Sequence, residues 1–74
     1  MQALVREVLA AWRQAERVAE EHAPGTTEHK AAEVAVERLR LLYIDLVDGD
    51  ALLDPAAAEA LLAKFRLPHA LVEA

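Results

Sequence analysis

The chain has 74 residues, among them 17 alanines, 12 leucines and two glycines, with no serine, asparagine or cysteine and a formal net charge of −5. This composition favours helix throughout a single small domain, 1–74, and it excludes disulfides and thiolate metal sites. The negative charge would repel a phosphate backbone, and no apolar run approaches the roughly 18 residues of a membrane span, so we expect neither a nucleic-acid nor a membrane partner and a cytoplasmic location.

Residues 2–22 are predicted to form an amphipathic helix. Apolar side chains recur at alternating intervals of three and four residues, which is the seam of a heptad pattern, and charged side chains occupy the opposite face. The seam comprises Val5, Val8, Trp12, Ala15, Ala19 and His22, and it is widened on one side by Leu4, Ala11 and Val18.

Pro24 and Gly25 predict the end of this helix. The threonine pair 26–27 then supplies an N-cap for a second helix over 28–48, and Glu28 is favourable in its first turn. The seam of this second helix comprises Ala32, Ala35, Leu39, Leu42 and Leu46, flanked by Val36, Tyr43 and Val47.

The two seams match as antiparallel partners. In a hairpin that closes near residue 25, the numbers of facing positions sum to about 50. Small residues then face each other near the loop, as with Ala15 and Ala35, and large ones meet at the open end. We therefore predict an antiparallel helical hairpin over 1–48, with a core formed by Val5, Val8, Trp12, Leu39, Leu42, Tyr43 and Leu46.

A third, shorter helix is predicted over 55–66. Asp54 is a suitable N-cap, Pro55 is favourable in the first helical position, and the Leu67-Pro68 pair marks the exit. The preceding segment, 49–54, becomes a hinge, and 55–74 becomes a C-terminal helix and tail. The large side chains at the open end of the hairpin should splay the first two helices, and the third helix would fill that gap.

Val34, Leu41 and Ile44 form an apolar strip on the second helix, away from its seam. One hairpin partner cannot cover both faces, and a surplus apolar strip on a small domain is typical of an interface. We expect two chains to pair as a homodimer with a four-helix bundle; a three-helix monomer that offers the strip to another protein is the alternative. The predicted interface residues are Val34, Leu41, Ile44, Leu61, Leu62 and Phe65.

Few side chains in the sequence are typical of a catalytic or metal-binding site. His22 and His29 lie near the predicted loop and are the candidate metal ligands, but two ligands without a fixed third are more typical of a solvated loop than of a metal site. Asp45, Asp48 and Asp50 resemble a calcium loop only at first sight, because the acids that an EF-hand requires are missing. We interpret these aspartates as part of a helix end and a hinge, and leave a bound cation open.

An enzymatic alternative comes from a partial resemblance. Helical nucleotide pyrophosphohydrolases of the MazG type bind magnesium through a Glu-Glu-x-x-Glu run followed by Glu-x-x-Asp on the next helix. Glu20-Glu21-x-x-Pro24 and Asp45-x-x-Asp48 resemble this pattern, but depart from it at the third and fourth glutamates. The resemblance implies a metal-dependent nucleotide phosphohydrolase whose site would be built across a dimer.

Non-enzymatic binding is the function that we expect from the sequence. The usual serine and cysteine nucleophiles are absent, and no glycine-rich phosphate loop exists. We therefore predict no catalytic residue and no cofactor, and a protein–protein interaction module that serves as an adaptor, regulator or assembly subunit. A third interpretation, a nucleic-acid-binding regulator, would use the face of Arg6, Arg13 and Arg17, although neighbouring glutamates compensate that face.

Overall fold

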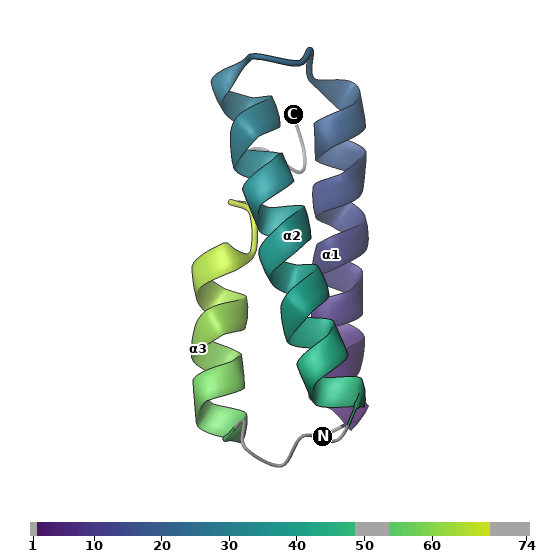
Figure 1. Ribbon diagram of the computed structural model, residues 1–74, viewed down its shortest axis with the longest axis vertical. Coiled ribbons are helices and arrows are strands. Elements are labelled where there is room, and N and C mark those ends of the chain that lie inside the picture. Colours follow the sequence, from purple (N-terminus) through teal and green to yellow (C-terminus); the bar gives the residue numbers. More distant parts are fainter. Residues whose placement is uncertain (1, 49–53, 69–74) are drawn as a thin grey trace.

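The computed structural model describes residues 2–48 and 54–68, and all the regular structure in these ranges is helical (Figure 1). The helices are α1 (Gln2–Glu21), α2 (Thr27–Val47) and α3 (Pro55–Phe65). The all-α prediction is confirmed, and each predicted helix end agrees to within one residue. Most of the predicted hinge, 49–53, and the tail from residue 69 lie outside the described residues.

The connection between α1 and α2 follows the local sequence. Gly25 adopts a φ of 93°, a left-handed backbone conformation that favours glycine. Thr26 is the N-cap of α2, and its hydroxyl accepts a hydrogen bond from the backbone N–H of His29 at 3.2 Å. The same hydroxyl donates to the carbonyl of Ala23 at 2.7 Å, so Thr26 links the end of one helix to the start of the next.

Helix α3 begins as predicted at the Asp54-Pro55 pair. Asp54 has an extended backbone, and its carbonyl accepts the first helical hydrogen bond, from the N–H of Ala58 at 2.9 Å. The Asp54 side chain makes no capping hydrogen bond, so the proline, with its fixed backbone angle, is the stronger local start signal.

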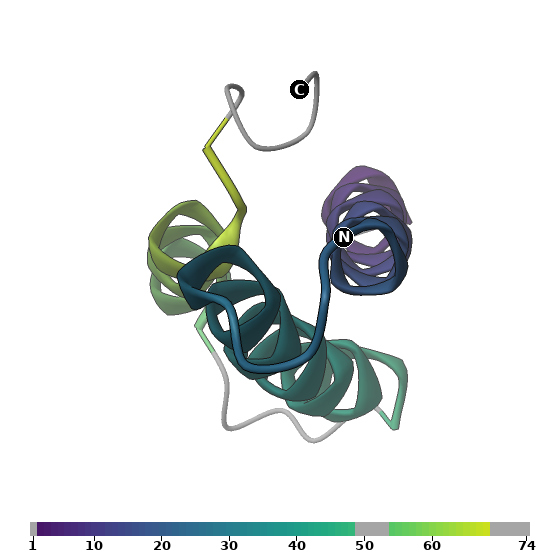
Figure 2. The same cartoon turned by 90° about the horizontal axis from the view of Figure 1, so that it is seen from above.

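The three helices stand at the corners of a triangle, with α2 beside both of the others (Figure 2). Helices α1 and α2 pack closely as an antiparallel hairpin, and α3 runs back along α2 in the same chain (Figure 1). The structure is therefore a three-helix arrangement of one chain. A four-helix bundle of two chains is not part of it.

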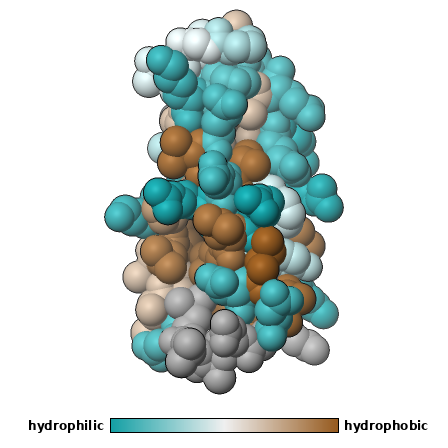
Figure 3. Space-filling view, viewed as in Figure 1, coloured by the Kyte–Doolittle hydropathy of each residue, from teal (hydrophilic) through white to brown (hydrophobic). Residues whose placement is uncertain are grey.

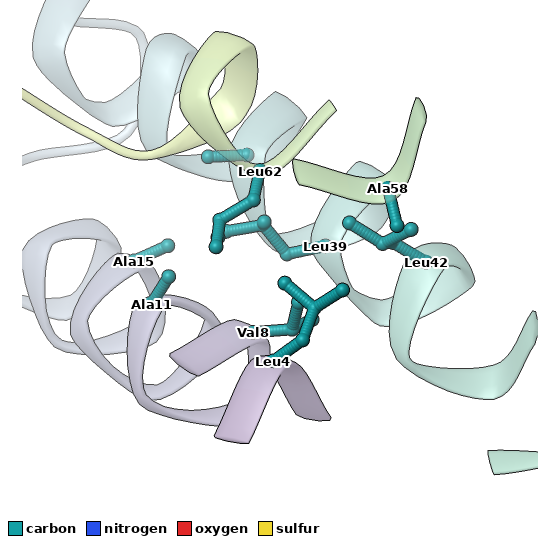
Figure 4. Packing of buried hydrophobic residues seen from close by; sticks show 9 residues of the cluster. Leu4, Val8, Ala11, Ala15, Leu39, Leu42, Ala58 and Leu62 are labelled. Carbon is teal, nitrogen blue, oxygen red and sulfur yellow. The ribbon is translucent and has the colours of Figure 1, made fainter. Parts of the chain in front are cut away.

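All three helices contribute to one hydrophobic core (Figure 4). Leu39 of α2 and Val8 of α1 are fully buried, and Ala58 of α3 packs against the same cluster. The cluster comprises Leu4, Val8, Ala11, Ala15, Leu39, Leu42, Ala58, Leu62 and, near the loop, Ala35.

The buried stripe of α1 is turned relative to the predicted seam. Leu4 and Ala11, which the sequence placed at its edge, are buried, whereas Val5 and Trp12 are half-buried. The reason is that α3 also packs against α1, which draws the centre of the core toward that side. Of the other predicted core residues, Leu39 and Leu42 are buried, and Tyr43 and Leu46 pack against the cluster while half-buried.

Candidate interaction surface

The outer face of α2 carries apolar side chains that the chain itself leaves uncovered. Four large hydrophobic residues are exposed among residues 2–48 and 54–68, and all four belong to this helix: Val34 (53%), Leu41 (42%), Ile44 (39%) and Val47 (53%). Figure 3 shows apolar side chains in the middle of this face, with hydrophilic side chains among them. We call these four residues the α2 patch.

A groove between α2 and α3 adjoins the α2 patch. It has a volume of about 210 Å³. Its floor is apolar, and a charged residue stands at each end of the α2 side: Arg38 near the middle of the helix and Asp45 two turns later. The residues that line it are Arg38, Leu41, Leu42, Asp45, Leu61 and Phe65.

Cations cover part of the groove's aromatic wall. The guanidinium carbon of Arg38 lies 5.9 Å from the centre of the Phe65 ring, and the Lys64 ammonium nitrogen lies 5.5 Å from it. Both distances are within the range of cation–π attraction. Arg38 is therefore held at the edge of the groove by a ring of the neighbouring helix.

Five of the six residues predicted for the interface contribute to this surface. Val34, Leu41 and Ile44 are exposed, and Leu61 and Phe65 are half-buried in the wall of the groove. The sixth, Leu62, is only 5% exposed and belongs to the core of its own chain.

Sequence reasoning placed Val47 beside the seam of the second helix, whereas the structure leaves it exposed, and it did not single out Arg38 as part of the surface. Val47 could have been found from its position three residues after Ile44 on the same helix. The importance of Arg38 could not be predicted, because it depends on where α3 lies.

The side of α2 that adjoins α1 is acidic. A wide groove of about 500 Å³ runs between α1 and α2, and it is lined by four glutamates, one arginine and two apolar residues. These residues are Glu16, Ala19, Glu20, Glu33, Val36, Glu37 and Arg40. Two such faces would repel each other, so this side is unsuited to pairing with a copy of itself.

The two candidate histidines bind the end of α1. The Nδ1 atom of His29 lies 2.7 Å from the Ala19 carbonyl and 3.1 Å from that of His22, while Nδ1 of His22 lies 2.9 Å from the Val18 carbonyl. Carbonyl oxygens only accept, so each Nδ1 carries a hydrogen and donates it. The last carbonyls of a helix lack partners within the helix, and the two histidines supply them.

The remaining ring nitrogen of His29, Nε2, lies 3.4 Å from a carboxylate oxygen of Glu33. Across the described parts of the chain, no three histidine, aspartate or glutamate side chains come close enough together to hold a metal ion. The two histidines thus have a local structural role at the hairpin loop. Asp50, the third aspartate of the candidate cation site, lies outside the described residues.

The carboxylates of the phosphohydrolase alternative lie at opposite ends of the hairpin. Glu20 and Glu21 end α1 near the loop, while Asp45 and Asp48 mark the far end of α2. At about 1.5 Å of rise per residue, α2 separates the two pairs by more than roughly 20 Å. One chain therefore does not assemble this donor set.

The arginine face of α1 is compensated by neighbouring groups. Arg13 forms an ion pair with Glu16 at 3.4 Å, and its guanidinium carbon lies 5.7 Å from the centre of the Trp12 ring. Trp12 in turn packs against Tyr43, with 5.6 Å between the ring centres. The aromatic residues therefore belong to the packing of the hairpin.

None of the helices that the structure describes combines the length and the hydropathy that crossing a bilayer would require.

Comparisons of the chain with known protein families, with curated proteins and with solved structures gave no match.

Proposed function

We propose that the protein is a small, non-enzymatic interaction module that works as a homodimer, in the role of an adaptor, regulator or assembly subunit. The observation that carries the proposal is the α2 patch: four large apolar side chains exposed on one helix, beside an apolar groove. Exposed apolar surface of this kind on a small domain is typical of a protein-binding site.

The side chains of the α2 patch do not belong to the hydrophobic core of their own chain. The stripe of α2 that packs against α1 and α3 comprises Leu39, Leu42 and neighbouring alanines, and it lies on the other side of the helix. The chain thus gains no core packing from Val34 or Val47, whose exposed fractions are both 53%. A second chain that covered this surface would add the buried area that a domain of 74 residues otherwise lacks.

The position of α3 suggests how a four-helix bundle would form. Pairing two hairpins through their α1–α2 grooves would bring eight glutamates together, four from each chain. Pairing through the face shared by α2 and α3 would instead bring two apolar grooves together, and α2 and α3 of both chains would form the four helices. We favour this second arrangement.

A non-enzymatic role is supported by the character of the described side chains. No polar or charged residue is buried between residues 2 and 48 or between 54 and 68, and the buried side-chain polar atom without a hydrogen-bond partner there is Nε1 of Trp12, which lies in the packing of the hairpin. Catalytic groups usually work in clefts where burial tunes them, whereas the four glutamates of the wide acidic groove are exposed or half-buried. For a phosphohydrolase, Glu20 and Asp45 would have to meet across two chains, which the favoured arrangement does not provide.

The proposal is tested by adding a charge to the α2 patch. The Leu41→Lys variant should remain folded, because Leu41 is 42% exposed, but it should lose self-association, because the dimer would bury an unpaired ammonium. Ala10→Lys is the matched control, since Ala10 is exposed on α1, outside both grooves.

Size-exclusion chromatography with light scattering at tens of micromolar measures the outcome. We expect dimers for the wild type and for Ala10→Lys, and monomers for Leu41→Lys, with circular dichroism showing equal helix content. Equal masses for all three proteins would contradict the proposed surface.

A further inference from the structure

The α2–α3 groove carries opposite charges at its two ends. Arg38 and Asp45 both line it, seven residues apart on α2, and Leu41 lies between them. Seven residues are two helical turns, about 10.5 Å at 1.5 Å per residue, so the two charges stand on the same side of the helix. The groove therefore has a positive end, an apolar middle and a negative end.

Neither charge forms an ion pair with another of the described residues. The ion pairs of residues 2–48 and 54–68 are Arg13 with Glu16 and His29 with Glu33, and both are remote from this groove. Arg38 and Asp45 are exposed, and Arg38 is positioned by the Phe65 ring. Each is available to a partner.

We propose that two copies of the chain associate through this face about a two-fold axis, with their α2 helices antiparallel and crossing beside Leu41. The proposal rests on the homodimer proposed above and specifies its orientation. A two-fold axis beside Leu41 places Arg38 of each copy against Asp45 of the other, so that two ion pairs flank the central leucines. Parallel helices in register would place arginine against arginine and aspartate against aspartate.

The charge pattern of the groove fits a second copy of this chain as its binding partner. When a second copy is turned about the two-fold axis, the positive end of its groove faces the negative end of the first, and the apolar middles face each other. This self-complementarity is a property of two-fold interfaces. Exposed ion pairs add little affinity, but like charges in contact suppress wrong arrangements. In this dimer the leucines and Phe65 supply the attraction, and Arg38 and Asp45 fix the orientation.

Charge reversal tests the reciprocal pairs. Arg38→Asp places two aspartates together at both ends of the interface, and Asp45→Arg places two arginines together. Each single variant should weaken self-association at least about tenfold, because two attractions are replaced by two repulsions. The double variant, Arg38→Asp with Asp45→Arg, should restore it, and a mixture of the two single variants should form heterodimers.

Arg17→Asp is the matched control. It makes the same change of charge at an exposed position of α1, outside both grooves, and should leave association nearly unchanged. Single reversals that associate like the wild type, or a double variant that stays as weak as the singles, would overturn the antiparallel orientation while leaving the homodimer standing. A wild type that is monomeric at tens of micromolar would overturn both.

Cysteine cross-linking provides an independent test, because the chain has no cysteine of its own. In the proposed dimer, Leu41→Cys lies near the axis and should form a disulfide with its copy. Val34→Cys would be separated from its copy by about 15 residues of helix, roughly 22 Å, which is far beyond the reach of about 7 Å between the Cα atoms of a disulfide. Rapid cross-linking of Val34→Cys would contradict the proposal, because only parallel helices bring those positions together.

Discussion

At the scale of single residues, the end of α1 shows how side chains replace missing backbone partners. Pro24 and Gly25 stop the helix, and its last carbonyls would otherwise face water or the start of α2. His29 donates to two of these carbonyls from across the loop, and Thr26 links the loop to the first turn of α2. The sequence indicated the stop and the threonine cap, because both depend on local backbone chemistry.

The role of His29 could not be predicted from the sequence. Its carbonyl partners lie up to ten residues away, and which of them it reaches depends on how closely α1 and α2 pack at the loop. Spacing alone suggested proximity to His22 and a candidate metal site. In the structure, each histidine instead forms hydrogen bonds with backbone carbonyls at the end of α1.

Replacing His29 with alanine should destabilise the hairpin. The variant leaves the Ala19 and His22 carbonyls without their donor, which costs about 1 kcal/mol of the free energy of unfolding. Urea unfolding followed by circular dichroism measures the loss, with Lys30→Ala at the exposed neighbouring position as the control. Equal unfolding midpoints for the two variants would show that the hydrogen bonds contribute nothing.

At the scale of helices, the boundaries were predictable and the rotation of α1 was not. Proline, glycine and threonine act on the residues next to them, so the ends of all three helices could be placed to within one residue. The rotation of α1 about its own axis depends on all its neighbours. Matching α1 with α2 alone predicted that Val5 and Trp12 would be central in the core. The contact with α3 brings Leu4 and Ala11 into the core instead.

The gradation of side-chain size along the hairpin is retained. Ala15 and Ala35, at 0% and 3% exposure, occupy the core toward the loop, and Leu39 and Leu42 occupy it toward the open end. Small residues of both helices thus fill the core toward the loop. Larger residues fill it toward the open end, where Ala58 of α3 belongs to the same cluster.

Enlarging a buried alanine in the loop-side part of the core should therefore lower the free energy of unfolding. Ala15→Leu adds three heavy atoms to a position with no exposed surface, and we expect a loss of about 1–3 kcal/mol in the free energy of unfolding. Ala10→Leu makes the same change at an exposed position of the same helix and should be nearly neutral. Thermal unfolding of the two variants compares them, and equal melting temperatures would contradict the packing described for the loop end.

At the scale of the whole molecule, the two grooves have opposite character. The groove between α1 and α2 is lined by four glutamates, whereas the one between α2 and α3 is apolar with one charge of each sign at its ends. The periodicity of α2 predicted part of the apolar surface, because Val34, Leu41 and Ile44 lie away from its seam. The groove itself was not predictable, since it exists only where α3 folds back along α2.

Self-association of the chain is the property on which the proposed function depends most. Sedimentation equilibrium of the wild-type protein, over a concentration range up to tens of micromolar, measures this directly. We expect a mass approaching twice the 8.1 kDa of one chain, falling toward a single chain on dilution. A mass of one chain at every concentration, with helix content intact, would contradict the proposed homodimer.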